Sequence, residues 1–226
     1  RVFLIGGYFK EISRYLRTTY EYIEKENKMK RRCNMIFRRS DHSVVSNKEY
    51  IYAVGAFIDG TFSNSMERYD VKNDTWEIRA SMNIPRSGVG LCVFNSNFIF
   101  AFGGRNASNF RMTTIESYDI SNNFWREITY AQTEVWDEGG YLCQAHQISK
   151  NKILIFGRSA PPTEDEVKSC YEFTPDTGEI VETNHLAQHS AFVNPGICYN
   201  DSLYFVGRSF KIHRFSLVDN HWSLYN

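Results

Sequence analysis

Short apolar runs that end in glycine recur along the chain and are separated by polar segments. The clearest run extends from Phe98 to Phe102, is apolar at every position, and is followed by Gly103 and Gly104. A short run of this kind indicates a β-strand that is buried on both faces. The intervening polar segments, such as Asp70 to Thr75, have the composition of tight turns. The pattern therefore predicts an all-β chain made of many short strands.

The glycine-ended run occurs five times at a nearly constant interval. Its first glycines are 49, 48, 54 and 50 residues apart, at Gly6, Gly55, Gly103, Gly157 and Gly207. An aromatic residue follows each run, at Tyr22, Tyr69, Tyr118, Tyr171 and Phe215. Seven residues further on stand Met29, Trp76, Trp125, Gly178 and Trp222. A period near 50 residues with four short strands per unit is typical of a β-propeller.

These residues resemble the Kelch-repeat family, whose units combine an apolar strand closed by paired glycines with a tyrosine and a tryptophan seven residues apart. The resemblance implies a Kelch-type β-propeller of four-stranded antiparallel blades. We expect five blades, of which the first lacks its innermost strand, at residues 1–33, 40–80, 87–130, 141–184 and 195–226. Kelch propellers most often have six blades. We therefore expect a fragment of a longer chain, with a partner covering the gap as the alternative.

The repeated residues are interpreted as structural. Glycine permits backbone conformations that are closed to other residues, and large rings supply area between neighbouring blades. The positions assigned to this role are Gly6, Gly7, Gly55, Gly103, Gly104, Gly157, Gly207, Tyr22, Tyr69, Tyr118, Tyr171, Trp76, Trp125 and Trp222.

Composition narrows the range of partners and compartments. The 226 residues include 26 basic and 26 acidic side chains, which gives no overall attraction to nucleic acid or to a membrane surface. No apolar run approaches the about 20 residues that span a bilayer. The five cysteines show no CxxC spacing and are interpreted as free thiols, which favours a reducing compartment. We therefore expect a cytoplasmic protein that binds other proteins.

The long loops are the expected recognition surface. In a four-stranded meander the loops after the second and fourth strands emerge on one face, here at residues 8–18, 56–65, 105–113, 130–140 and 158–167. Charge is spread unevenly over this architecture, with a basic junction between the first and second copies and an acidic junction between the third and fourth. The basic side chains are Lys28, Lys30, Arg31, Arg32, Arg38 and Arg39, and the acidic ones are Glu134, Asp137, Glu138, Glu164, Asp165 and Glu166.

Two interpretations of this charge remain open. The clusters are either solvated loop residues or the two poles of a docking face. The candidate partner-binding residues are Arg31, Arg32, Arg38, Arg39, Arg86, Arg105, Glu164, Asp165 and Glu166. Arg39 and Arg86 begin innermost strands. The resemblance implies that arginines there contact a bound peptide, and the alternative is an ion pair with a neighbouring carboxylate.

An enzymatic function is less favoured. Some Kelch propellers resemble copper radical oxidases, which need converging histidine and tyrosine ligands. His185 and His189 are four residues apart, but they are expected to lie in a loop, where that spacing does not place both side chains on one face. His42 and His146 are interpreted as structural. No nucleophile–base order or phosphate loop is evident, so we expect no catalytic residue, metal or cofactor.

The sequence therefore predicts a non-catalytic protein-interaction scaffold. The preferred setting is a structural subunit of a large cytoskeletal or ciliary assembly. The alternative setting is the substrate-recognition domain of a BTB–Kelch ubiquitin-ligase adaptor. A metal-dependent oxidase of Kelch type is the third and least favoured candidate.

Overall fold

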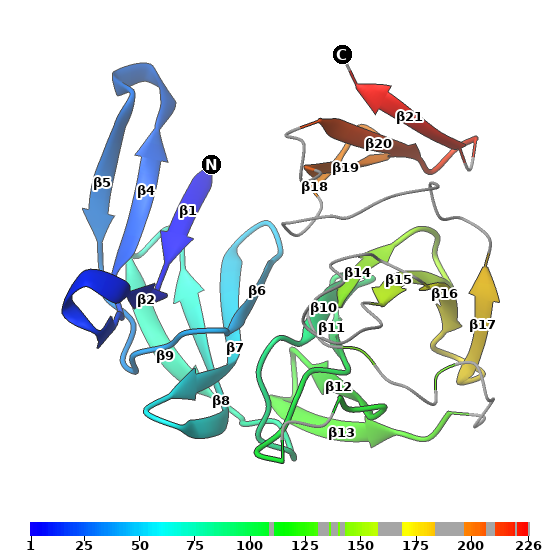
Figure 1. Ribbon diagram of the computed structural model, residues 1–226, viewed down its shortest axis with the longest axis horizontal. Coiled ribbons are helices and arrows are strands. Elements are labelled where there is room, and N and C mark those ends of the chain that lie inside the picture. The colour runs from blue at the N-terminus through cyan, green and yellow to red at the C-terminus, as the bar shows by residue number, and fades with distance from the viewer. Residues whose placement is uncertain are drawn as a thin grey trace.

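The computed structural model describes residues 1–108, 111–130, 136, 140, 143–157, 169–183, 197–206, 211–219 and 221–225. These residues form an all-β fold in which five antiparallel sheets are the blades of a propeller and a sixth, two-stranded sheet is an inserted hairpin. Figure 1 shows the sheets following one another in chain order around a ring, with blade 1 and blade 5 at its two ends. The predicted five-bladed propeller is confirmed, and so is the three-stranded first blade.

Each blade is a meander in which neighbouring strands are consecutive in the chain, apart from a small hairpin inserted in blade 1. Blade 1 consists of β1 (Val2–Ile5), β4 (Thr19–Ile23) and β5 (Lys28–Arg32). Its insertion contains β2 (Tyr8–Phe9), η1 (Lys10–Ile12) and β3 (Arg14–Tyr15), and η2 (Glu24–Glu26) precedes β5. Blade 2 consists of β6 (Ser43–Ser46), β7 (Tyr50–Ile58), β8 (Thr61–Asp70) and β9 (Thr75–Arg79).

The remaining blades repeat the four-stranded plan. Blade 3 consists of β10 (Gly90–Phe94), β11 (Phe98–Phe102), β12 (Ile115–Asp119) and β13 (Phe124–Ile128). Blade 4 consists of β14 (Gln144–Gln147), β15 (Ile153–Gly157), β16 (Ser169–Thr174) and β17 (Glu179–Thr183). Blade 5 consists of β18 (Ile197–Tyr199), β19 (Ser202–Val206), β20 (Ile212–Ser216) and β21 (His221–Tyr225).

The hydrophobic core is divided among the junctions between successive blades. Alternate residues of a strand face opposite sides of its blade, so Ile99 and Ala101 pack toward blade 2 while Phe100 and Phe102 pack toward blade 4. Four clusters of buried residues join blades 1 to 2, 2 to 3, 3 to 4 and 4 to 5. Within the described part of the chain, none of these clusters joins blade 5 to blade 1.

The aromatic residues of the repeat form cross-strand pairs at these junctions. Tyr69 lies opposite Trp76 with ring centroids 5.1 Å apart, and Tyr118 lies opposite Trp125 at 5.2 Å. The indole nitrogen of Trp125 donates to the carbonyl oxygen of Ala80 in the segment that links blades 2 and 3. Each pair therefore fixes its own blade to the link that precedes it.

In blade 4 the two outer repeat positions lie two residues further along the chain than the sequence predicted. Ile153, the residue four before Gly157, pairs with Phe173, and Phe173 pairs with Ile180, which is seven residues further on. Phe173 and Ile180 therefore hold the places of Tyr69 and Trp76, not Tyr171 and Gly178 as the sequence suggested. Tyr171 is buried at the same junction because strand residues two apart face the same side.

Blade 2 lacks the long loop that was expected at residues 56–65. β7 and β8 continue pairing beyond a bulge at residues 54–56 and end in a two-residue turn at Asp59 and Gly60. Both turn residues have positive φ, at 50° and 81°, which suits the right-handed twist of a hairpin. The expected loop is therefore an extended hairpin.

Candidate protein-interaction surface

One end of blades 1 and 2 carries residues 8–18, a predicted part of the recognition surface, beside the link between the two blades and the tip of the blade 2 hairpin. Ile5, Thr19 and Arg32 lie side by side across blade 1, so the end of β5 adjoins the insertion after β1. The loop face of blades 1 and 2 is defined here as residues 7–18, 33–40 and 57–62. It consists of the inserted hairpin, the link between the two blades and the tip of the blade 2 hairpin.

Backbone hydrogen bonds hold the inserted hairpin against the link. Gly7 N donates to the carbonyl oxygen of Arg39, Leu16 N donates to that of Gly7, and Arg39 N donates to that of Leu16, with lengths of 2.8 to 2.9 Å. The ring centroids of Tyr8 and Tyr15 are 4.9 Å apart across the hairpin. The two segments are therefore one fixed unit of the surface.

Large apolar side chains are exposed on this unit. Five residues form the apolar patch, and their exposed fractions are 48% for Tyr8, 43% for Phe9, 58% for Ile12, 42% for Ile36 and 43% for Phe37. Several exposed apolar side chains on adjoining segments are a feature of protein-binding surfaces. The sequence did not predict this patch, although the adjacent apolar pairs Tyr8-Phe9, within a predicted loop, and Ile36-Phe37, between two predicted blades, were the signal that could have revealed it.

The charge around the apolar patch is predominantly positive. Residues 7–18 and 33–40 contribute the exposed cations Lys10, Arg14, Arg17 and Arg38 and the carboxylate of Glu11, and residues 57–62 add the exposed carboxylate of Asp59. Arg31 is exposed at the end of β5, and its guanidinium is 3.5 Å from the side-chain oxygen of Asn34. This surface would therefore attract an acidic partner.

Arg32 contributes less free charge than the sequence suggested. Its guanidinium binds Glu21, which also accepts a 2.5 Å hydrogen bond from Arg1. The hydrogen bonds from Arg1 and Arg32 lower the pKa of Glu21 to about 2. Arg32 is therefore part of an ion-pair network at the junction of blades 1 and 2.

Arg39 and Arg86 are fully buried at equivalent junctions. The guanidinium of Arg39 is 3.0 Å from the carboxylate of Glu67 on β8, and that of Arg86 is 2.8 Å from Glu116 on β12. Burial lowers the pKa of both guanidinium groups, while the carboxylates oppose that shift. Neither side chain reaches solvent, so the geometry supports the interpretation as ion pairs and not contact with a bound peptide.

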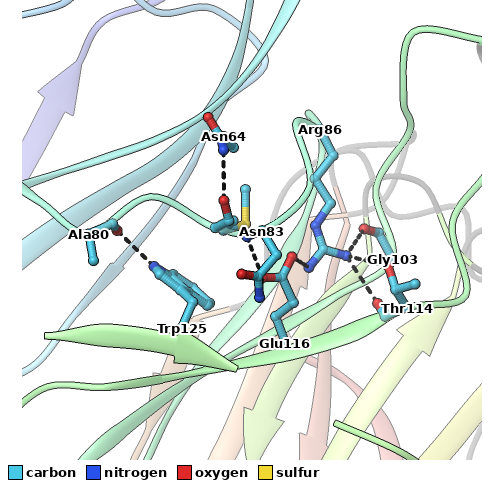
Figure 2. Close-up of polar contacts among 9 residues, drawn as sticks. Asn64, Ala80, Asn83, Arg86, Gly103, Thr114, Glu116 and Trp125 are labelled. Atoms are coloured by element: carbon cyan, nitrogen blue, oxygen red, sulfur yellow. Dashed lines mark hydrogen bonds and ion pairs between the residues drawn. The ribbon is translucent and has the colours of Figure 1, made fainter. Parts of the chain in front are cut away.

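The second junction shows how completely such an arginine is bound. The Arg86 guanidinium donates to the carbonyl oxygens of Gly103 at 2.8 Å and Thr114 at 3.0 Å (Figure 2). Glu116 also accepts hydrogen bonds from the backbone and side-chain nitrogens of Asn83. The pair thus joins the link after blade 2 to β12 and to the backbone at the end of β11 and the start of β12.

Arg105 lies beside the tip of the blade 2 hairpin. Its guanidinium carbon is 6.0 Å from the ring centroid of Phe57 and 5.9 Å from that of Phe62, and it is 3.4 Å from Asp41. Asp41 balances the charge of Arg105, so this position adds an arginine beside the hairpin tip but no net positive charge. Glu164, Asp165 and Glu166, with Glu134, Asp137 and Glu138, lie outside the described residues, so the acidic pole stays a prediction.

The described residues contain no group of three histidine, cysteine, aspartate or glutamate side chains placed to hold a metal ion. All five cysteines are free. His185 and His189 lie outside the described part, and His42 and His146 belong to no such group among the described residues. Across the described ranges, no helix is long and apolar enough to cross a bilayer.

Comparison with known proteins finds the Kelch motif at residues 38–83 and 85–130. Alpha-scruin of Limulus polyphemus is 25% identical over 224 residues, which cover 91% of this chain and 23% of that protein. Kelch-like protein 15 of Danio rerio is 30% identical over 128 residues, or 54% of this chain and 20% of that protein. Kelch-like protein 4 of Homo sapiens is 35% identical over 65 residues, or 29% of this chain and 9% of that protein. The chain thus spans less than a quarter of these relatives.

Proposed function

Because the chain belongs to the Kelch-repeat family of β-propellers, we propose that it is a non-catalytic scaffold that binds other proteins through the loop face of blades 1 and 2. The observation that carries this proposal is the apolar patch with its cationic surround. The patch supplies apolar area for burial, and the exposed cations Arg31 and Arg38 select an acidic partner.

A structural subunit of a large cytoskeletal or ciliary assembly is the preferred setting. The match to Alpha-scruin supports it, because that match covers 91% of the chain. The substrate-recognition domain of a BTB–Kelch adaptor is the second candidate, and the matches to Kelch-like proteins 15 and 4 favour it. The free thiols are consistent with a cytoplasmic location for either role.

Removing the apolar patch should weaken partner binding strongly without unfolding the chain. The variant Phe9→Ser, Ile12→Ser, Phe37→Ser is expected to reduce recovery of specific partners by about tenfold or more, as hot-spot residues do. Its free energy of unfolding should change by about 1 kcal/mol or less, because these side chains are half exposed. Quantitative affinity capture from the organism's own cells, together with urea unfolding, measures both quantities.

A matched control removes equally exposed apolar residues from outer strands. Ile78, Phe124 and Val181 are 55%, 46% and 47% exposed on β9, β13 and β17. Their replacement by serine should leave recovery of partners unchanged. Equal recovery by the patch variant and the control would show that the patch is not the docking surface.

Charge reversal tests the cationic part of the surface separately. The variant Arg31→Glu, Arg38→Glu should weaken binding of the most enriched partner by about tenfold at low salt, and the difference should shrink at 0.5 M salt. Lys48→Glu with Lys72→Glu makes the same charge change on exposed residues in the short loops of the opposite face. An equal loss from both double variants would point to net charge, not to this surface.

A further inference from the structure

The outermost strands of blades 1 and 4 each carry charge of a single sign. β5 contains two lysines, two arginines and no carboxylate, whereas β17 contains two glutamates and no cation. The outer strands β9 and β13 each contain one glutamate and one arginine, and the only titratable residues of β21 are His221 and Tyr225. Among the five outer strands of the described blades, β5 and β17 are therefore the two that present a one-signed edge.

Most of this charge is exposed and forms no ion pair within the described part of the chain. The two lysines of β5 and the two glutamates of β17 are exposed, and none of them is paired with a described residue. On β9, by contrast, Glu77 binds Arg68 of its own blade. The turn before β5 adds charge of both signs, with Glu24, Lys25 and Glu26. The side chains that are open to a partner are therefore those on the strands themselves: Lys28, Lys30, Glu179 and Glu182.

The exposure of these side chains does not depend on whether a neighbouring blade is present. β17 belongs to blade 4, which packs against blade 3 on one side and blade 5 on the other. Lys28 and Lys30 alternate with Met29, which holds the register position of Trp76, so the two lysines lie on the side of blade 1 that faces blade 2. Outer-strand side chains therefore stay accessible beside a packed blade.

Both strands are also free edges of their sheets. β5 ends the order β1-β4-β5, and β17 ends the order β14-β15-β16-β17. Along such an edge, backbone N–H and C=O groups have no strand partner and can pair with a strand of another molecule. Figure 1 shows the two edges on opposite sides of the ring, with β5 at the left and β17 at the right. One molecule can therefore use both edges at the same time.

Charge determines which of these edges attract each other. Lysines along an edge strand oppose pairing with a second copy of the same strand, and the two glutamates have the same effect on β17. The unlike combination is attractive. An antiparallel register gives three favourable pairs across the two edges: Lys28 with Glu182, Met29 with Val181, and Arg31 with Glu179.

The apolar pair selects this direction. Met29 and Val181 are both 47% exposed, so the antiparallel register brings two accessible apolar side chains together between the two ion pairs. A parallel register with the same number of ion pairs would place Met29 opposite Ile180, which is 1% exposed and points into the junction with blade 3. The antiparallel arrangement therefore fits the two edges better.

We propose that the β5 edge of one copy of this chain pairs antiparallel with the β17 edge of a second copy. The contact is head to tail, because each molecule has a cationic edge on one side and an acidic edge on the other. Repeated pairing therefore gives an open chain of molecules. The pairing goes beyond the scaffold function proposed above and does not rest on it, because neither strand belongs to the loop face of blades 1 and 2. Arg31 borders that face and is left unchanged in the tests.

Sedimentation velocity of the whole chain tests for this association. A contact between two five-residue edges is small, so association is expected only at high protein concentration, about 0.1–0.5 mM. Between about 10 µM and 0.5 mM at low salt, the weight-average sedimentation coefficient should rise about 1.5-fold or more without levelling off at a dimer. Raising the salt to about 0.5 M should remove most of the rise. A chain that stays monomeric throughout this range at low salt would overturn the proposal.

Two edge variants test which strands are in contact. Lys28→Glu, Lys30→Gln changes the cationic edge, with glutamine at the second position because Lys30 lies opposite Glu21 across β4 and β5. Glu179→Lys, Glu182→Lys changes the acidic edge. Each variant alone should associate at least about tenfold more weakly than the parent chain. Because each retains one native edge, an equal mixture of the two should form a 1:1 pair and no longer chain.

A matched control makes the charge change of the first variant elsewhere. Lys48→Glu, Lys72→Gln alters exposed lysines in the short loops of blade 2 and should leave association unchanged. Parental association of either folded edge variant would overturn the proposal. So would a closed dimer that is insensitive to salt, because it would assign self-association to an apolar face. The two edge variants change different strands, so either one decides the question if the other does not fold.

Cysteine cross-linking tests the register. In a background of Cys33→Ser and Cys198→Ser, the two exposed native thiols are removed. A mixture of Met29→Cys with Val181→Cys should then form an intermolecular disulfide under mild oxidation, identified by peptide mass mapping. Phe124→Cys on β13, at a side chain that is 46% exposed, replaces Val181→Cys in the control mixture and should cross-link at least about tenfold less. Equal yields from the two mixtures would overturn the pairing of β5 with β17.

Discussion

Replacing Arg86 with methionine is expected to lower the free energy of unfolding by about 3–5 kcal/mol. The side chain is 0% exposed, and its removal leaves the carboxylate of Glu116 buried without its counter-charge. The carbonyl oxygens of Gly103 and Thr114 lose a donor at the same time. Equilibrium unfolding in urea, followed by tryptophan fluorescence, measures the loss directly.

The control for this prediction is an ion pair that lies at the surface. Lys152 binds Glu172 within blade 4, and the two side chains are 44% and 18% exposed. Water stabilises the remaining carboxylate when the lysine is removed, so Lys152→Met should cost about 1 kcal/mol or less. Equal costs for the two variants would mean that Arg86 contributes packing area alone and that its buried pair has no special role.

The repeat made the architecture predictable from sequence. Each copy needs an apolar strand that is buried on both sides. The apolar runs Phe98–Phe102 and Ile153–Gly157 therefore predict the second strand of their blades. The error of two residues in blade 4 arises because Tyr171 and Phe173 face the same side of one strand. Only the observed pairing of Phe173 with Ile153 separates them, and side-chain chemistry alone does not.

The candidate surface was predictable only in part. Sequence placed Arg31 and Arg38 on loops, where both are exposed, but it could not choose between partner contact and ion pairing for Arg39 and Arg86. That choice depends on Glu67 and Glu116, which are 28 and 30 residues further along the chain. Contacts over such separations follow from blade packing and leave no local signal.

Two half-buried histidines, each with a ring nitrogen shielded from solvent, are expected to make the fold sensitive to mild acid. Burial lowers the pKa of His42 to about 4, with the charge of Arg39 acting in the same direction and a backbone hydrogen bond with Ile5 opposing it. Burial alone lowers the pKa of His146 to about 4, and its ring lies 6.1 Å from that of Phe205. One ring nitrogen of each, Nδ1 of His42 and Nε2 of His146, has no hydrogen-bond partner among the described residues.

The sign of this pH dependence follows from whether the folded or the unfolded chain binds protons at the higher pH. An unfolded histidine has a pKa near 6.5. Between about pH 6.5 and pH 4, these two histidines are therefore protonated in the unfolded chain but remain neutral in the folded chain. Stability from these groups is fully present above about pH 6.5 and is lost as the pH falls toward 4. A pKa difference of 2.5 corresponds to a loss of about 2 kcal/mol per histidine at pH 5, or about 4 kcal/mol for the pair.

Urea unfolding at pH 7, 6 and 5 tests this expectation. His42→Gln and His146→Gln should each remove about half of the decline in stability, and the double variant should remove most of it, whatever their cost at pH 7. The ion pairs of Glu21 do not interfere, because its lowered pKa of about 2 confines its contribution to the loss below about pH 4.5. His221→Gln, at an exposed histidine of β21, should leave the decline unchanged. A decline that persists in the double variant would show that other groups govern the acid sensitivity, because no proton could then be taken up at either buried position.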